Sequence, residues 1–388
     1  MDALYSKCME LFGDLKKNKK NIAVLVCLMV VLSRLVMFGL YLIWNSRHCD
    51  EVSFFEAFRH YDANWYYGIA EQGYRPQPLY SGSVEWAFFP LMPMILRIFY
   101  LLGFHNLDAI GFFLNTISFT VALYLAFLYI LFTRKNLKIA ILFCFFMSFG
   151  VYSFYFSSLY TEPLFLLFLV AALYCLEKKR YLAVGIIGML LSATRNTGVM
   201  LIFAVITYYL FLQKQQLGKD FWKQIIPDFI RNRRLVLCIA LIPLGLFLFM
   251  FYLKYLTGDP LAFMRVQIAW HRVVGNPFKN LYVALRSTEK HPALQAFWAL
   301  GGYYMIWSLL KRKRYSEGVL AILFLTIPLC TGIESISRYM IGSFVFVLAY
   351  TEDLLSWNGK DKKIIGCVVP CIVELFLIMM WYSNVGLI

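Results

Sequence analysis

A succession of apolar stretches constrains this sequence of 388 residues more than any other feature. A helix of about 20 apolar residues crosses the hydrocarbon core of a bilayer, and somewhat shorter helices can do so when other helices shield them. Hydrophobic residues make up 61% of the chain and charged residues only 15%. We therefore predict an all-α polytopic membrane protein, with residues 1–388 forming a single integral membrane domain. Its predicted transmembrane helices, about eleven in number, cover residues 22–44, 109–132, 139–157, 161–176, 181–194, 197–213, 235–256, 293–310, 318–333, 338–352 and 364–382.

Short basic runs separate the apolar stretches. Lys and Arg total 37 against 22 Asp and Glu, a balance that in a soluble protein would suggest nucleic-acid binding. In membrane proteins, however, Lys and Arg accumulate in cytoplasmic loops and orient the helices, so no nucleic-acid partner is expected. The basic runs at residues 178–180, 231–234 and 311–314 then place two long segments on the outward side. These are residues 45–108 and 257–292.

Residues 86–103 form a further apolar segment that hydropathy alone would predict as another crossing. Pro90 and Pro93 interrupt the segment, Arg97 lies inside it, and its aromatic residues suit the headgroup zone. A crossing here would also reverse the side of every later basic run. We therefore expect interfacial helices in the first outward loop, and a short tilted crossing is the alternative.

Polar residues that are unusual near a membrane share the outward side under this topology. Ionisable side chains at membrane depth are uncommon and mark functional sites. Some of these residues lie in the outward loops and others at the outward ends of apolar stretches. The sequence thus predicts one candidate site on one face of the membrane. Its residues are Asp62, Glu162, Arg195, Asn196, Arg265 and Arg338.

Four motifs follow one another in the first half of the chain. They occupy residues 60–74, 87–93, 157–165 and 194–198, and their order and spacing resemble those of the PIG-V/Gpi18 mannosyltransferases. Two later segments, 258–263 and 337–339, are similar to motifs of bacterial relatives. Each motif alone is weak evidence, but four motifs in order are specific.

This resemblance implies a GT-C fold and a glycosyltransferase with its active site at the outer membrane surface. It also implies a polyprenyl-phosphate sugar as donor, with mannose as the hexose, and a glycan or glycolipid as acceptor in or on the lipid bilayer. The sequence agrees, because it contains no Gly-rich phosphate loop and no Asp-x-Asp metal motif. No cofactor is expected, and a divalent metal remains open.

Two departures from the eukaryotic members favour a prokaryotic-type enzyme. Tyr61 precedes the aspartate where those members usually have Trp, and the chain is shorter than theirs. The resemblance then implies an enzyme of the bacterial inner membrane whose active site faces the periplasm. In a eukaryote, the same topology would place the site in the lumen of the endoplasmic reticulum.

Asp62 is the candidate general base of an inverting transfer. The acceptor hydroxyl must lose a proton as it attacks the anomeric carbon of the sugar, and a nearby carboxylate can accept that proton. Tyr61, Trp65 and Tyr66 adjoin Asp62 in the sequence and are expected to bind the sugar by stacking. The alternative is that Asp62 only caps a helix beginning at Ala63.

Arg195 and Arg338 are the candidate ligands of the donor phosphate. The leaving phosphate gains negative charge, and the planar guanidinium group of arginine matches its geometry. Either side chain could instead extend to lipid headgroups. Glu162 is expected to orient Arg195 or to bind the acceptor, although with Pro163 it could simply begin its helix. The predicted substrate-binding set is completed by Asn196, Arg265 and Tyr339.

Two other classes of function fit the same composition. One is a transporter or flippase of lipid-linked glycans, and the other is a non-catalytic subunit of a glycosylation complex. Transporters often contain inverted repeats with broken helices at matching positions, and no such repeat is visible in the sequence. The clustering of polar residues on one face, rather than at the bilayer midplane, favours the enzyme.

Overall fold

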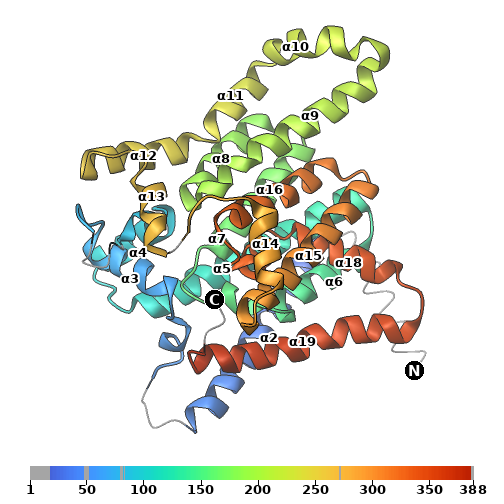
Figure 1. The fold of residues 1–388 in the computed structure, drawn as a ribbon. Coiled ribbons are helices and arrows are strands. Elements are labelled where there is room, and N and C mark those ends of the chain that lie inside the picture. Colours follow the sequence, from blue (N-terminus) through green and yellow to red (C-terminus); the bar gives the residue numbers. More distant parts are fainter. Residues whose placement is uncertain (1–17, 48–51, 79–81, 83, 271, 386–388) are drawn as a thin grey trace.

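The computed structural model describes residues 18–47, 52–78, 82, 84–270 and 272–385. Within these residues the chain forms helices joined by turns, without a β-strand. Figure 1 shows most of the helices gathered into one bundle, from which α9, α10 and α11 extend. Helix α9 covers Leu201–Leu217, α10 covers Phe221–Arg231 and α11 covers Arg233–Leu241.

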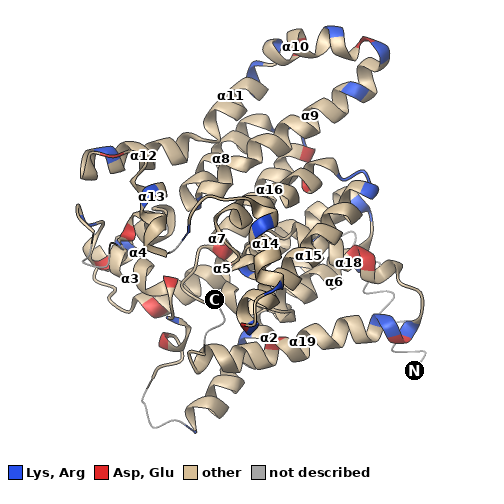
Figure 2. Cartoon of the chain, viewed as in Figure 1, with Lys and Arg blue, Asp and Glu red and all other residues tan. Residues whose placement is uncertain are grey.

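Five helical stretches of the described chain are long and apolar enough to cross a membrane, judged by length and composition. Together with the shorter apolar helices they support a multi-pass integral membrane protein. In Figure 2, Lys, Arg, Asp and Glu lie mostly at helix ends and in connections. The five stretches are α2 (Lys19–Asn45), α5 (Leu107–Arg134), Asn196–Arg231, Arg233–Thr257 and α19 (Lys360–Tyr382).

Every apolar stretch predicted from the sequence contains a helix, and some of them are broken. In four stretches a short turn or 3-10 segment interrupts the helix, as between α11 and α12. The bundle also contains α6 (Leu137–Phe149), η3 (Ser153–Phe156), α7 (Glu162–Glu177), α8 (Tyr181–Thr194), η4 (Asn196–Met200), α12 (Leu244–Thr257), α14 (Pro277–Leu285), α15 (Lys290–Lys311), α16 (Tyr315–Thr331), α17 (Ile336–Gly342) and α18 (Val345–Ser356), and η5 (Gly218–Asp220) joins α9 to α10.

Asparagine side chains cap the starts of two successive helices, α5 and α6. The side chain of Asn106 accepts a hydrogen bond from the amide of Ala109, at 3.0 Å, and caps the start of α5. The helix ends at Lys135, which has a left-handed φ of 53°. Asn136 then caps α6, so the chain reverses within two residues. Helix α5 packs against α7, and α7 packs against α8.

The described part of the predicted first outward loop folds into short helices. It contains η1 (Glu56–Phe58), α3 (Asp62–Gln72), η2 (Glu85–Ala87) and α4 (Leu91–Leu101). Helix α4 has 11 residues and is therefore about 16 Å long, too short to cross a bilayer alone. Arg97 of α4 donates hydrogen bonds to the carbonyl oxygens of Ala70 and Glu71, at 3.1 and 2.9 Å. These bonds fasten α4 to the end of α3, in agreement with the predicted interfacial arrangement.

Helix α19 closes the bundle against α2 and the first outward loop. Its Tyr382 hydroxyl donates a hydrogen bond to the carbonyl oxygen of Met37 in α2, at 3.0 Å. The neighbouring Trp381 is fully buried, and its ring lies 5.3 Å from that of His60 and 5.8 Å from that of Tyr61. Residues from the two ends of the sequence therefore meet immediately before α3.

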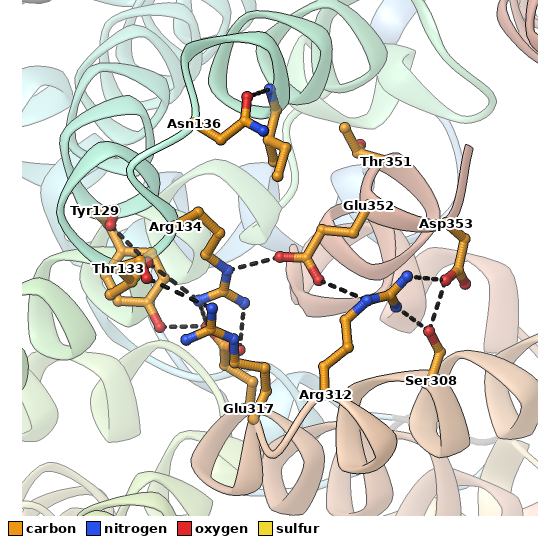
Figure 3. A network of polar contacts seen from close by, with 12 residues as sticks. Tyr129, Thr133, Arg134, Asn136, Ser308, Arg312, Glu317, Thr351, Glu352 and Asp353 are labelled. Atoms are coloured by element: carbon orange, nitrogen blue, oxygen red, sulfur yellow. Dashed lines mark hydrogen bonds and ion pairs between the residues drawn. The ribbon is translucent and has the colours of Figure 1, made fainter. Parts of the chain in front are cut away.

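A buried network of ion pairs joins several helices at the C-terminal end of α5 (Figure 3). Arg134 pairs with Glu317 of α16 at 2.5 Å and with Glu352 of α18 at 2.7 Å. Arg312, which follows α15, lies 3.6 Å from Glu352 and also pairs with Asp353. Because these charges are largely withdrawn from water, each depends on its partners. The network holds α5, α15, α16 and α18 together at this end.

Candidate active site

Asp62 is the first residue of α3, and its carboxylate pairs with Arg338 of α17. The distance from Arg338 Nη1 to Asp62 Oδ2 is 2.6 Å. The Asp62 side chain is 29% exposed, whereas that of Arg338 is 5% exposed. The residue in the N-cap position is Tyr61, which makes no side-chain capping bond. The structure therefore gives Asp62 a partner in a distant helix, and it does not support the alternative of Asp62 as a cap for a helix beginning at Ala63.

Glu162 adjoins both Arg338 and Arg195, and it therefore links the pair of Asp62 and Arg338 to Arg195. Glu162 begins α7 with Pro163 in its first turn, and its side chain is fully buried. One of its oxygens pairs with Arg195 and lies 3.5 Å from Arg338 Nε. Arg195 also donates from Nε to the Thr161 hydroxyl, at 2.7 Å. The predicted contact between Glu162 and Arg195 is therefore present, and Glu162 holds two guanidinium groups close together.

A close backbone contact fixes the turn that carries Arg195. Arg195 lies between α8 and η4, in an extended conformation. Gly198 follows in η4, where a Cβ atom would lie 2.4 Å from the carbonyl oxygen of Leu191. Only glycine fits this approach without a shift of the backbone. The turn therefore holds Arg195 toward α7.

Tyr339 and Arg272 adjoin the cluster formed by Asp62, Glu162, Arg195 and Arg338. The guanidinium carbons of Arg195 and Arg338 lie 5.7 and 5.6 Å from the centre of the Tyr339 ring. Arg272 donates from Nη1 to the Tyr339 hydroxyl, at 3.0 Å. The cluster thus contains three guanidinium groups and two carboxylates, which leaves one net positive charge. Such a site can accept an anionic group such as a phosphate.

The aromatic residues that follow Asp62 do not form a single wall. Trp65 stacks on Phe88, with ring centres 5.6 Å apart, and remains partly exposed. Tyr66 is buried, and this burial raises the pKa of its hydroxyl, which therefore stays protonated. Tyr67 instead packs against Arg59. Successive helix residues point about 100° apart, so these rings face different directions. The sugar-binding roles of Tyr61, Trp65 and Tyr66 remain predictions.

Tyr61 has an unusual backbone conformation directly before Asp62. Its φ of 50° is uncommon for a residue with a large side chain. Its ring is held beside Trp381 of α19. Strained backbone of this kind persists where the surroundings impose it, and it is often found at functional sites. Here it sets the direction in which α3 starts.

Two predicted site residues lie apart from this cluster. Asn196 is exposed at the start of η4. Arg265 is 73% exposed, pairs with Asp259 at 3.1 Å and borders a surface pocket of about 290 Å³. The segment of residues 257–292 that carries Arg265 is not one continuous helix. It contains α13 (Ala262–Arg265) and η6 (Val266–Trp270), and Arg272 follows η6.

The arrangement of the helices is similar to that of solved structures of an oligosaccharyltransferase from Archaeoglobus fulgidus. The apo form matches with a TM-score of 0.53 and 12% identity, covering 92% of this chain and 55% of that chain. The structure of AglB from Archaeoglobus fulgidus in complex with an inhibitory peptide and a dolichol-phosphate matches with a TM-score of 0.46 and 10% identity over the same shares. No protein-family model matches the sequence, and no curated protein matches it.

The chain has the GT-C fold. It spans 55% of the length of the oligosaccharyltransferase in its apo form. Asp62, Glu162, Arg195 and Arg338 lie at or beside four different connections between helices and meet at one place. The predicted fold class is confirmed, and the predicted roles of these residues remain predictions.

The fold also brings together residues that were not among the predicted site residues. Thr161 belongs to the motif at residues 157–165, and its place directly before Glu162 was an available signal. Arg272 lies seven residues after Arg265, and that spacing alone does not distinguish a site residue from a solvated surface residue. Trp381 lies near the end of the last apolar stretch, where an aromatic residue would be expected in the headgroup zone. Its contact with Tyr61 depends on helix packing.

Proposed function

We propose that this protein is a membrane glycosyltransferase of the PIG-V/Gpi18-like type. It transfers a hexose, which we take to be mannose, from a polyprenyl-phosphate sugar to a hydroxyl of a lipid-linked or cell-envelope glycan, with inversion. The observation that carries this proposal is the partly exposed Asp62 carboxylate, held by Arg338 beside two further arginines. The GT-C fold supports it as an analogy, since a fold alone does not define a reaction.

Asp62 acts as the general base in this proposal. Its carboxylate accepts the proton of the acceptor hydroxyl while the hydroxyl oxygen forms a bond to the anomeric carbon. The bond from that carbon to the phosphate oxygen breaks, and the phosphate leaves with the electron pair. Arg338 keeps Asp62 in position through the 2.6 Å contact. Because Arg338 also adjoins Glu162, much of its charge is already compensated.

The donor phosphate lies near Arg195 and Arg272 in this proposal. Arg195 shares the carboxylate of Glu162 with Arg338. Arg272 contacts the hydroxyl of Tyr339, and in the described part of the chain no carboxylate pairs with it. Its charge is therefore the least compensated in the cluster and the most available to an incoming anion. A phosphate that gains charge as the glycosidic bond breaks is stabilised by such a fixed cation.

An assay with purified protein in lipid nanodiscs tests the proposal. Synthetic polyprenyl-phosphate mannose, glucose, galactose and arabinose are offered as donors, with nucleotide sugars in parallel. We expect release of polyprenyl phosphate from one of the lipid donors and not from the nucleotide sugars. Use of a nucleotide sugar alone would overturn the donor assignment.

The Asp62→Asn variant separates the enzyme from a flippase or a non-catalytic subunit. Asparagine keeps the size of the side chain and an oxygen that Arg338 can contact, but it is a much weaker base. Transfer should fall by about a hundredfold or more, because general base catalysis typically contributes 10²–10⁴-fold. Glu71→Gln, on the same helix, is the matched control and should retain activity. Unchanged transfer by a well-folded Asp62→Asn protein would exclude Asp62 as the base.

A further inference from the structure

Helix α10 presents a row of apolar side chains that point away from the protein. Trp222, Ile226 and Ile230 are 83%, 67% and 65% exposed. They follow one another at intervals of four residues, so they share one face of the helix. The neighbouring face, which carries Phe221 and Ile225, is buried. Apolar side chains thus occupy about half of the circumference of α10, and the described protein covers only part of them.

Helix α10 folds back along the end of α9. The chain turns through η5, and the ring of Phe229 in α10 then lies 5.9 Å from the ring of Tyr209 in α9. The two helices form a hairpin, which extends from the bundle in Figure 1. The exposed apolar row lies on this hairpin.

The base of the hairpin lies at the predicted cytoplasmic surface of the membrane. Helix α8 begins directly after the basic run 178–180, and α11 begins within the basic run 231–234. The two helices pack together closely, because a Cβ atom on Gly185 would lie 3.0 Å from Cα of Cys238. Each basic run ends about one turn before this contact, so both runs lie at one level. Since α9 approaches this level from the predicted outward side, the rest of the hairpin lies at or beyond it.

Basic side chains surround the exposed apolar row. Residues 214–234 contain six Lys and Arg against two Asp, and all six basic residues are exposed. Figure 2 shows Lys and Arg along α10 and its connections. Lys223 borders the apolar row, whereas Gln224 points to the opposite side of the helix. A basic helix with exposed Trp and Ile on one face is typical of a helix that lies on an anionic lipid surface.

The lipid-facing side of the bundle continues toward this helix. Helices α11 and α12 pack against α8 with one side. Their other side exposes apolar residues that, in a membrane-spanning bundle, contact lipid tails. These residues are Val236, Leu237, Phe247, Leu248 and Phe251. Figure 1 shows α10, α11 and α12 in succession along one edge of the molecule, so the lipid around α11 is also within reach of α10.

We infer that α10 binds the predicted cytoplasmic leaflet through anionic phospholipids. Trp222, Ile226 and Ile230 lie among the headgroups and the first methylenes of the lipid tails, and the surrounding basic side chains contact the lipid phosphates. Gln224 on the opposite face stays in water. This interaction does not depend on the proposed sugar transfer, because α10 and the candidate active site lie on opposite sides of the membrane in the predicted topology.

Lipid retention tests the preference for anionic headgroups. Native mass spectrometry compares the phosphatidylglycerol and phosphatidylcholine that stay bound after purification from an equimolar mixture. The double variant Lys219→Gln/Lys223→Gln removes two charges beside the apolar row. The control Lys360→Gln/Lys362→Gln removes two exposed charges from another predicted cytoplasmic run.

We expect phosphatidylglycerol to be enriched about twofold or more on the unmodified protein and on the control, because basic residues near a membrane surface attract anionic lipids. The enrichment should be lower in Lys219→Gln/Lys223→Gln. Absence of enrichment on the unmodified protein, or equal enrichment on the two variants, would overturn the inference.

Spin labels on single cysteines test the position of the exposed face. Ile226→Cys and Gln224→Cys are introduced separately into a protein whose nine native cysteines have been replaced, and each is labelled with a nitroxide. The proteins are placed in nanodiscs of phosphatidylcholine and phosphatidylglycerol. Gln224 is the matched control, because it is exposed on the opposite face of the same helix.

The label at residue 226 should collide more often with oxygen, which concentrates in lipid, and the label at residue 224 with a water-soluble nickel chelate. Equal or reversed accessibility would overturn the inference. A label at residue 226 that is shielded from both reagents would also overturn it, and it would show that a protein surface covers this face of α10.

Discussion

At the scale of single residues, the contact between Asp62 and Arg338 joins two side chains with different surroundings. Asp62 is partly open to solvent, whereas Arg338 is buried and also adjoins Glu162. A buried guanidinium with two carboxylate neighbours is fixed in place, so Asp62 is fixed as well. We therefore regard Arg338 as a positioning residue for the proposed base.

Substitution of Arg338 should affect both stability and transfer. Arg338→Met leaves the buried Glu162 with one partner fewer, and loss of one member of a buried pair typically costs about 3–5 kcal/mol. Arg338→Lys keeps the charge but loses the planar fork that spans both carboxylates. We expect Arg338→Lys to fold with reduced kcat and Arg338→Met to unfold at lower temperature. Thermal unfolding in detergent and transfer assays measure the two effects, and equal activity of Arg338→Lys and the unmodified protein would contradict the positioning role.

Arg272→Gln should separate donor binding from folding. Arg272 is partly exposed and contacts the Tyr339 hydroxyl, so its replacement leaves no buried carboxylate unpaired. If Arg272 stabilises the phosphate, kcat/KM for the lipid donor should fall by roughly ten- to a hundredfold. The unfolding temperature should stay the same. Arg265→Gln serves as the control on the same outward loop, and an equal loss in both variants would argue against a specific role for Arg272.

At the scale of helices, the ion pairs at the C-terminal end of α5 hold α5, α15, α16 and α18 together. Arg134 ends α5 beside Lys135, at a place where basic residues typically orient a membrane helix. The structure shows it 3% exposed between Glu317 and Glu352. Its neighbour Lys135 is exposed. Arg134 and Lys135 are adjacent in the sequence, but Arg134 is buried in the ion-pair network and Lys135 is exposed.

Arg134→Met should destabilise the bundle without changing the chemistry. Two buried carboxylates would lose their partner, at a cost of about 3–5 kcal/mol. Lys135→Met removes an equal charge one residue later and should change the free energy of unfolding by no more than about 0.5 kcal/mol. Unfolding in denaturant and KM values for the fraction that stays folded would be measured. Matching stability of the two variants would show that the network contributes little.

The sequence predicted the helices well, because apolar length and basic runs are local signals. It also predicted that Asp62, Glu162, Arg195 and Arg338 share one side of the membrane, since each lies at the outward end of a segment. It did not predict which carboxylate meets which arginine. Asp62 and Arg338 are 276 residues apart, and their contact depends on how α17 packs against α3 and α7. Arg265, predicted in the site, instead pairs locally with Asp259.

At the scale of the whole molecule, the two polar clusters lie toward opposite ends of α5. Near the start of α5, Asp108 pairs with Arg59 of the first outward loop, at 3.1 Å. At its other end, Arg134 enters the buried network. A helix of 28 residues is about 42 Å long, more than the thickness of the hydrocarbon core. Both clusters can therefore lie near the membrane surfaces, on different sides.

Cysteine labelling tests this arrangement directly. Gln77→Cys and Lys135→Cys are introduced separately into a protein whose nine native cysteines have been replaced. Both positions are exposed in the structure. A membrane-impermeant maleimide added to intact cells should label Gln77→Cys, and it should label Lys135→Cys only after permeabilisation. Labelling of both from the same side would mean that residues 86–103 cross the membrane.

The contact between Trp381 and Tyr61 has a consequence for how the protein is made. A ribosome delivers α3 long before α19, so the proposed base reaches the membrane without the ring that supports the residue before it. Until α19 inserts, the strained turn at Tyr61 lacks its neighbour, and α3 can start in other directions. In the proposed function, a newly synthesised chain would thus complete the arrangement around Asp62 only when its last described helix is in place.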